Sequence, residues 1–216
     1  MKILLTGGSR GIGAAIKSRL ESQHHVVCPT RDELDLSSPT SVARFLENGN
    51  QFDGLINNAG INIIKPTAQI TDADMQLINQ VNYLAPLQLM QAILPGMAER
   101  SFGRVVNISS IWGVRSKAQR ALYSGTKFGL IGATKGFARE FAASNVTVNA
   151  VCPGFTQTEL TQQSLSESEK KEIIAQIPAQ RMATPDEIAR VVAFLIEPET
   201  AYLTGQSIIV DGGFTS

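Results

Sequence analysis

Short apolar runs alternate with amphipathic segments along almost the whole chain. Runs of apolar residues predict buried strands over residues 2–6, 25–28, 53–56, 104–108, 146–151 and 207–210. Apolar residues that recur every three or four positions predict helices over residues 11–21, 72–100, 120–143 and 185–196, with a further helix starting at Ser38. Repeated strand–helix–strand units are typical of an α/β protein, in which a doubly wound, mostly parallel sheet has helices on both faces.

Capping residues mark two of these helices, and one polar segment matches neither pattern. Ser38 can cap a helix that has Pro39 in its first turn, and Thr184 begins a capping box with Glu187. The polar segment 157–171 has no strand pattern, so we expect a partly helical flap over residues 156–175. No linker or repeat interrupts the sequence, which predicts one domain over residues 1–216.

Charge and cysteine content exclude several classes of partner. Lys plus Arg equals Asp plus Glu, at 19 each, so no overall charge favours nucleic acid or an anionic membrane. The N-terminal apolar run is too short for a signal peptide or a membrane span. Cys28 and Cys152 are expected to be buried, reduced thiols of a cytoplasmic protein. His24 and His25 have no partner at metal-ligand spacing, so we expect a polar turn and no metal site.

A glycine-rich loop follows the first predicted strand and leads into the first helix. It reads Thr-Gly-Gly-Ser-Arg-Gly-Ile-Gly over residues 6–13. Its glycines permit close approach of a pyrophosphate, and the helix N-terminus offers free N–H donors to phosphate oxygens. A glycine-rich turn without a ligand is the alternative, but the position between strand and helix favours a dinucleotide. We expect cofactor contacts from Gly7, Ser9, Arg10, Gly11, Ile12 and Gly13.

Tyr123 and Lys127 are candidates for proton transfer. They are four residues apart on a predicted helix, so they share one face. A free tyrosine has a pKa of ~10, and a neighbouring ammonium group would lower that pKa. Ser110 follows a predicted strand at the carboxyl edge of the sheet, where its hydroxyl could stabilise an oxyanion. A Tyr-x-x-x-Lys pair is common by chance, and an exposed helical pair is the alternative.

These motifs, with three further blocks, resemble the short-chain dehydrogenase/reductase family over essentially the whole chain. Ser110 precedes Tyr123 by 123 − 110 = 13 residues, the spacing in the family's ketoacyl reductases, which favours Ser110 over Ser109. The tail from Met182 to Phe214 is similar to that of 3-ketoacyl-[acyl-carrier-protein] reductases, although many branches of the family share it. The three further blocks are Asn-Asn-Ala-Gly at 57–60, Asn82, and Pro153 with Gly154.

The resemblance implies a Rossmann fold, a nicotinamide cofactor and a role for each matching residue. Tyr123 would be the general acid in carbonyl reduction and the base in alcohol oxidation. Lys127 would lower the pKa of Tyr123 and bind the nicotinamide ribose, so both residues would contact the cofactor. Ser110 would position the carbonyl oxygen, and Asn82 would kink the long helix and hold a water of the proton relay. Further cofactor contacts would come from Asn58, Ala59, Gly60, Pro153, Gly154 and Thr156.

The chain departs from the family after the second predicted strand. The family usually has a helix and a third strand there, before an Asp-Val or Asp-Leu pair. Here Arg31 is followed almost at once by Asp35 and Leu36, so we expect one helix to be lost and the third strand to be reduced or absent. Asp35 and Leu36 would still reach the adenine, in a pocket altered by the shortening.

Cofactor choice depends on the end of the second strand. A carboxylate there favours NAD through the ribose 2′-hydroxyl, and an arginine favours the 2′-phosphate of NADP. The aligned residue is Thr30, and the cations Arg31 and Arg10 are within reach. We therefore predict that NADP(H) is preferred, with NAD(H) as a possible alternative. Asp32 and Glu33 would favour NAD if the shortened loop folds them inward.

Residues beyond Ser110 bear on the substrate. Trp112 belongs either to the core or to the wall of a partly apolar pocket, which would also include Ile111, Val114 and Phe155. A basic cluster follows at Arg115, Lys117 and Arg120. We interpret this cluster as a solvated face in preference to a docking site for an acidic carrier protein or a CoA group.

The predicted activity is hydride transfer between a nicotinamide cofactor and a carbonyl or alcohol. The substrate would be a small molecule, with a 3-ketoacyl thioester of CoA or a carrier protein as one candidate. A non-catalytic NADP(H)-sensing regulator and a scaffold subunit are the alternatives. The set of Asn82, Ser110, Tyr123 and Lys127 argues against both, because a sensor needs no proton relay. The resemblance also implies a homodimer or homotetramer.

Overall fold

The strands lie side by side in one parallel sheet in the computed structural model, which describes residues 1–47, 49, 51–159, 161 and 166–216. Their order across the sheet is β2-β1-β3-β4-β5-β6. The parallel sheet predicted from the strand–helix alternation is therefore confirmed. The strands are β1 (Lys2–Leu5), β2 (His25–Val27), β3 (Gly54–Asn57), β4 (Gly103–Ile108), β5 (Val146–Pro153) and β6 (Ser207–Val210).

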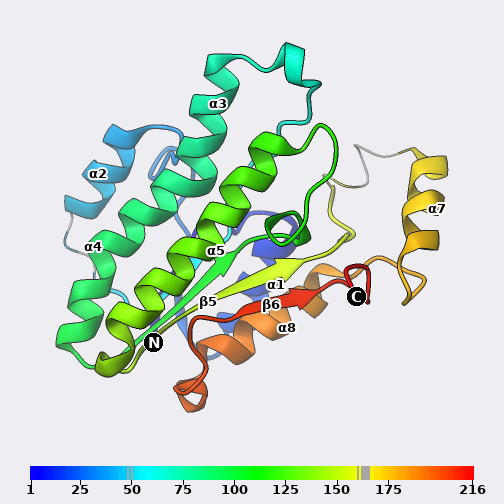
Figure 1. The fold of residues 1–216 in the computed structure, drawn as a ribbon. Helices are drawn as coiled ribbons and strands as arrows, with labels where there is room; N and C mark the ends of the chain where they lie inside the picture. Colours follow the sequence, from blue (N-terminus) through cyan, green and yellow to red (C-terminus); the bar gives the residue numbers. More distant parts are fainter. Residues whose placement is uncertain (48, 50, 160, 162–165) are drawn as a thin grey trace.

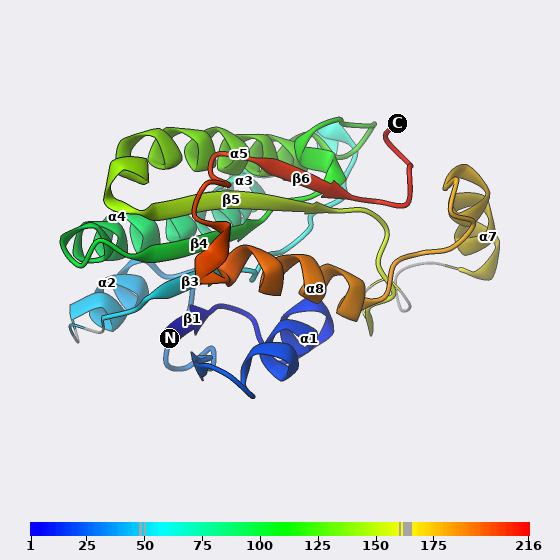
Figure 2. The same cartoon turned by 90° about the horizontal axis from the view of Figure 1, so that it is seen from below.

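Helices cover both faces of the sheet, as Figures 1 and 2 show. The helices α1 (Gly11–Leu20) and α8 (Pro185–Ile196) pack together on one face. The other face carries α2 (Pro39–Glu47), α3 (Asp72–Asn79), α4 (Ala85–Glu99) and α5 (Ala121–Phe141). Beyond the carboxyl ends of the strands stands α7 (Glu167–Gln176). Short 3₁₀ helices occupy Thr67–Gln69, Ile111–Gly113, Ala142–Ser144 and Pro198–Thr200.

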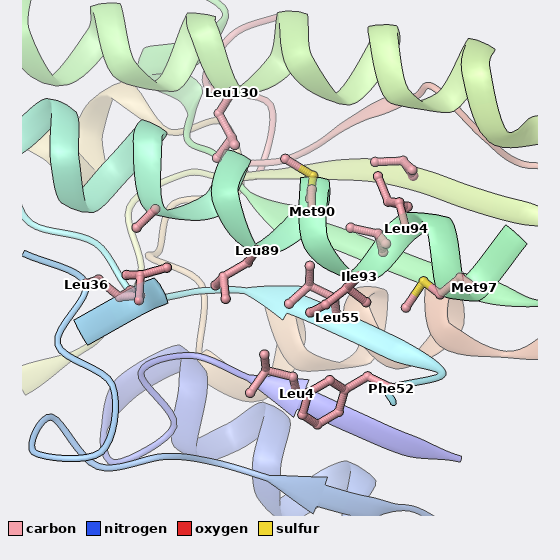
Figure 3. Packing of buried hydrophobic residues seen from close by; sticks show 14 of the residues in the cluster. Leu4, Leu36, Phe52, Leu55, Leu89, Met90, Ile93, Leu94, Met97 and Leu130 are labelled. Atoms are coloured by element: carbon pink, nitrogen blue, oxygen red, sulfur yellow. The ribbon is translucent and has the colours of Figure 1, made fainter. Parts of the chain in front are cut away.

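Side chains of the central strands alternate between two apolar clusters, one on each face. On β1, Leu4 packs with the cluster under α4, whereas Ile3 and Leu5 pack with the cluster under α1 and α8. All three side chains are fully buried, which explains why a strand of this sheet has a continuous apolar run. Figure 3 shows Leu4 and Leu55 of the sheet facing Leu89 and Leu94 of α4.

The region after β2 is shortened, and β2 forms an edge of the sheet. The described residues between Val27 and Gly54 contain α2 but no strand, so the predicted loss of the third strand is confirmed. Strand order reverses between β1 and β3, because β2 lies on one side of β1 and all later strands lie on the other. A doubly wound sheet binds its ligands in the crevice at such a switch point, outside the carboxyl ends of the strands.

The long helix predicted over residues 72–100 is present but irregular. Residues Gln80–Leu84 form a π-helical turn between α3 and α4, with Asn82 at its centre. Such turns are rare and often occur at functional sites. The helix is therefore interrupted at the residue where the family resemblance predicts a kink. The predicted caps are confirmed, since Ser38 Oγ accepts from the N–H of Ser41 and Thr184 forms its capping box with Glu187.

Three smaller expectations have mixed outcomes. Both cysteines are free thiols, but only Cys152 is buried, whereas Cys28 is half-buried. His24 is more than a residue of a polar turn, because both nitrogens of its imidazole are buried without a hydrogen-bond partner. Burial accordingly lowers the pKa of His24. Within the described ranges, the helices are all too short or too polar to cross a bilayer.

A core substitution tests the packing of α4 on the sheet. Leu94 is fully buried beneath α4, so Leu94→Ala should lower the free energy of unfolding by about 2–5 kcal/mol. Ile64→Ala is the control, since Ile64 is 49% exposed and its truncation should change that free energy by less than about 1 kcal/mol. Urea unfolding of the three proteins measures both effects. Equal losses for the two variants would contradict the packing described here.

Candidate active site

The glycine-rich loop makes a tight turn between β1 and α1. Gly7 and Gly11 have φ angles of +68° and +54°, in the left-handed region that favours glycine. A side chain at Gly13 would collide with the carbonyl of Gly7, because the first turn of α1 packs directly on the loop. The N-cap residue of α1, Arg10, makes no side-chain capping bond. The N–H groups of this helix end are therefore suited to bind phosphate oxygens.

Hydrogen bonds join this loop to the loop after β3. Thr6 Oγ1 accepts from the N–H groups of Asn58 and Ala59, each at 3.1 Å. The Asn58 side-chain amide donates to the carbonyl oxygens of Thr6 and Gly7, at 3.0 and 2.9 Å. Both sides of the switch-point crevice are thus held as one unit. Thr6 was not among the predicted site residues, and its only signal was a hydroxyl directly before the first loop glycine.

Lys127, Asn82 and Gly60 meet at the carboxyl end of β4. Lys127 Nζ donates to the carbonyl oxygen of Ile108 at 2.8 Å. Asn82 is held by Ile61, whose N–H donates to Asn82 Oδ1 and whose carbonyl accepts from Asn82 Nδ2, each at 2.8 Å. A Cβ added to Gly60 would lie 3.3 Å from Asn82 Oδ1 and 3.5 Å from Lys127 Nζ. A side chain at position 60 would therefore crowd both groups.

Ser110 and Tyr123 complete the group of four predicted catalytic residues. Ser110 follows β4, and its Oγ accepts from the N–H of Trp112 at 3.1 Å. The side chains of Tyr123 and Ser110 are hydrogen-bonded, and this bond lowers the pKa of the Tyr123 phenol. Lys127 Nζ lies 5.7 Å from the centroid of the Tyr123 ring. The structure therefore brings the four residues together from three elements, namely the π-turn, the end of β4 and α5.

Burial dominates the protonation behaviour of Tyr123 and Lys127. Burial raises the pKa of Tyr123, and this rise is only partly offset by the Ser110 hydrogen bond and the charge of Arg120. Burial also lowers the pKa of Lys127 to about 8. The expectation that Lys127 lowers the pKa of Tyr123 stays a prediction, with Lys127 Nζ 5.7 Å from the ring centroid. The Lys127 ammonium is bonded to the Ile108 carbonyl, and the groups that lower the tyrosine pKa are Ser110 and Arg120.

Pro153, Gly154 and Thr156 lie at the carboxyl end of β5, near the start of the flap. Gly154 packs against Asp211, whose Cα would lie 2.7 Å from a Cβ added at Gly154. Thr156 is buried and donates to the Gly154 carbonyl at 3.1 Å. Part of the flap predicted over residues 156–175, at residues 160 and 162–165, lies outside the described residues. Its described part includes α7, and the side chain of Thr158 would contact a Cβ at Gly11 of the glycine loop.

The predicted adenine-side residues are engaged within their own loop. Asp35 Oδ1 accepts from the N–H and hydroxyl of Ser37, at 2.9 and 2.7 Å, and its other oxygen lies 3.5 Å from Arg31 Nε. Leu36 is buried in the core. Glu33 folds back, so that its carboxylate accepts from the N–H and hydroxyl of Thr30 at 2.7 and 3.0 Å. A cavity of about 430 Å³ lies beside this loop, lined by Val27, Cys28, Pro29, Glu33, Arg44 and Phe45.

Trp112 is buried, and it forms part of an aromatic wall. Its ring meets those of Phe155 and Phe214 edge to face, with centroids 6.2 Å apart in each case. Phe155 and Phe214 also meet edge to face, at 5.3 Å. The rings come from three separate segments, directly after Ser110, after β5 and at the C-terminus. Phe214 was not among the residues that the sequence analysis grouped with Trp112, and a substrate-pocket wall at these rings stays a prediction.

Known proteins match this chain along its length. The family described as "Enoyl-(Acyl carrier protein) reductase" matches residues 8–215. A 3-oxoacyl-[acyl-carrier-protein] reductase of Vibrio cholerae is 36% identical, over 97% of this chain and 95% of the relative. An acetoacetyl-CoA reductase of Shinella zoogloeoides is 37% identical, over 97% and 96%. The solved structure of a 4-hydroxyisoleucine dehydrogenase complexed with NADH has a TM-score of 0.93 at 29% identity, covering 99% of this chain and 98% of its own.

The low pKa of Lys127 predicts a loss of reductase activity in alkaline solution. Lys127 is charged below its pKa of about 8 and neutral above it, whereas the raised pKa of Tyr123 keeps the phenol protonated to higher pH. If the charged lysine is required, kcat/KM for ketone reduction should fall about tenfold per pH unit above 8. A pH profile from 6 to 10 measures this fall.

Lys127→Arg provides the control for that profile. Arginine stays charged throughout this pH range, so the alkaline fall should move to higher pH in whatever activity the variant retains. Superimposable profiles for the two proteins would show that another group controls the loss.

Proposed function

The chain belongs to the short-chain dehydrogenase/reductase family and is an NAD(P)-dependent oxidoreductase of carbonyl and alcohol groups, and we propose that its substrate is a 3-ketoacyl thioester. The observation that carries the proposal is the convergence of Ser110, Tyr123, Lys127 and Asn82 beside an open helix N-terminus. The named relatives that reduce 3-oxoacyl and acetoacetyl thioesters support the substrate class. They offer no support for a non-catalytic sensor.

The residues present fit a nicotinamide dinucleotide. The turn at Gly7 and Gly11 leaves backbone N–H groups open to the pyrophosphate, and the loop at 58–60 would line the adenosine side. The ammonium of Lys127 is positioned to bind a ribose hydroxyl in addition to the Ile108 carbonyl. When bound, the nicotinamide supplies hydride to the carbonyl carbon in reduction.

The protein side of the reaction is proton transfer and charge stabilisation. Ser110 would hold the substrate carbonyl oxygen next to the Tyr123 hydroxyl, which donates its proton to that oxygen as the alcohol forms. Lys127 places a positive charge near the resulting phenolate. A water held at Asn82 would return a proton through Lys127. The raised pKa of Tyr123 favours its protonated form, which is the form that reduction requires.

We also propose that NADP(H) is the preferred cofactor and that NAD(H) is accepted less well. Arg10 is exposed at the start of α1, and the side chain of Arg31 is 78% exposed with a 3.5 Å pairing to Asp35, a weak surface contact that a 2′-phosphate could replace. Glu33 acts against this preference. Its carboxylate lies at the end of β2, where an acidic group favours the 2′-hydroxyl of NAD.

A homodimer or homotetramer in the cytoplasm is part of the same proposal. Leu77, Leu84 and Phe128 are large apolar side chains on α3, the π-turn and α5, and they are 43%, 43% and 45% exposed. An exposed apolar surface of this kind is favourable for association between copies of the chain.

The first test is ketone reduction with and without the Tyr123 hydroxyl. The substrate panel includes acetoacetyl thioesters and simple ketones, and NADPH or NADH oxidation is followed by absorbance. Tyr123→Phe should lower kcat by about 10²- to 10⁴-fold, because it removes the proton donor and leaves the ring in place. Tyr202→Phe is the matched control, since Tyr202 is fully exposed, and it should behave as the wild type. Wild-type turnover of simple ketones but of no thioester would overturn the proposed substrate.

The second test separates the groups that act on cofactor choice. Glu33→Gln removes the carboxylate at the end of β2, so it should raise kcat/KM for NADPH relative to NADH by about fivefold. Arg10→Gln combined with Arg31→Gln should lower the same ratio by about tenfold. Steady-state kinetics with both cofactors give the ratios. A wild-type enzyme that uses NADH as efficiently as NADPH would sink the proposed preference.

A further inference from the structure

Three cations lie against the aromatic wall beside Ser110. Arg115 Cζ is 5.2 Å from the centroid of the Phe214 ring. Lys117 Nζ and Arg120 Cζ lie over the ring of Trp112, at 5.4 and 5.9 Å. Cation–π contacts hold these side chains in place, while their N–H groups remain able to bind an anion. The segment interpreted from sequence as a solvated face is indeed exposed at Arg115 and Lys117, and its cations also form a cluster on the aromatic wall.

The cluster has no acidic partner in the part of the chain that the structure describes. No ion pair there includes Arg115, Lys117 or Arg120. Asp211 precedes the ring of Phe214, but its carboxylate is bonded to the N–H groups of Gly213 and Thr215 and to the Thr215 hydroxyl. The chain as a whole carries equal numbers of basic and acidic residues, so this excess of positive charge is local.

Arg120 connects the cluster with the reacting groups. Its Nε is buried and has no hydrogen-bond partner, which leaves a donor unsatisfied in the protein alone. The charge of Arg120 acts on Tyr123, which is three residues further along the chain at the start of α5. Trp112, which carries two of the cations, follows Ser110 by two residues. An anion bound by the cluster would therefore lie on the same side of the site as a carbonyl held by Ser110, with the linking arm of a substrate running along the aromatic wall between them.

We propose that Arg115, Lys117 and Arg120 form an anion subsite that binds the phosphate of the phosphopantetheine arm of the thioester substrate. This inference rests on the proposed function, since it concerns the arm that carries the 3-ketoacyl group. Arginine guanidinium groups bind phosphate oxygens with two parallel hydrogen bonds, and the exposed Arg115 offers such a guanidinium. The aromatic wall beneath the cations offers apolar contacts to the uncharged part of the arm.

A series of three acetoacetyl thioesters tests whether the subsite makes the enzyme prefer substrates that carry a phosphate. The pantetheine thioester has no phosphate, the 4′-phosphopantetheine thioester has one, and the coenzyme A thioester adds the nucleotide phosphates. The wild type should favour 4′-phosphopantetheine over pantetheine by about tenfold in kcat/KM. In Arg115→Gln combined with Lys117→Gln this preference should fall to about twofold or less. A general loss of structure would lower both rates and leave their ratio unchanged.

Lys17→Gln combined with Arg139→Gln is the matched control. Both residues are exposed on distant parts of α1 and α5, and the pair removes the same total charge. This variant should retain the wild-type preference. A loss of preference in it would indicate a long-range charge effect in place of a subsite. A loss confined to the coenzyme A thioester in the Arg115→Gln/Lys117→Gln variant would overturn the assignment to the arm phosphate.

Fluorescence separates the subsite from the proposed reaction. Trp112 is the only tryptophan of the chain, and two of the cations lie over its ring. Titration with 4′-phosphopantetheine should give a saturable change in fluorescence that disappears in the Arg115→Gln/Lys117→Gln variant and persists in the control. That response without thioester turnover would support the subsite and reject the proposed substrate. If the wild type reduces the thioesters without preferring those that carry a phosphate, and its fluorescence does not change with 4′-phosphopantetheine, the subsite is rejected. The proposed 3-ketoacyl thioester substrate is then retained.

Discussion

A buried ammonium group without a carboxylate partner is the constraint around which the candidate site is built. Lys127 Nζ is bonded to the Ile108 carbonyl, and no carboxylate pairs with it in the described residues. Removing a charge from water is unfavourable unless other groups stabilise it, which is why the pKa of Lys127 falls to about 8. The fold therefore keeps a cation that is incompletely stabilised, and a ribose hydroxyl is a suitable further partner.

The surrounding backbone leaves room for that group and limits its movement. The π-turn places Asn82 where Ile61 holds both ends of its amide, and glycine at position 60 leaves space in front of the ammonium. Thr6 and Asn58 tie the neighbouring loop to the glycine turn. An irregular helix turn and a glycine are each less favourable locally than a regular alternative, and their use together is typical of a functional site.

Local patterns predicted much of this architecture, because strands, caps and short loop motifs depend on neighbouring residues. The apolar run of β1, the capping box at Thr184 and the 13 residues from Ser110 to Tyr123 (123 − 110) are all readable in this way. Features that depend on distant contacts were not predictable. Arg104 is fully buried because its guanidinium donates to the carbonyls of Gly103, Asn145 and Pro198, and the pairing of Trp112 with Phe214 joins residues 214 − 112 = 102 positions apart.

Electrostatics were the least accessible part from sequence, since a pKa depends on burial and on every nearby charge. The Tyr-x-x-x-Lys spacing correctly places Tyr123 and Lys127 on one helix face, but it does not reveal that burial raises one pKa and lowers the other. Arg120 is the group that the spacing rule overlooks. It is close enough to lower the pKa of Tyr123, and it also belongs to the cationic cluster on Trp112. An anion bound there would partly neutralise Arg120, which would raise the pKa of Tyr123 further and strengthen its preference for the protonated form that carbonyl reduction uses.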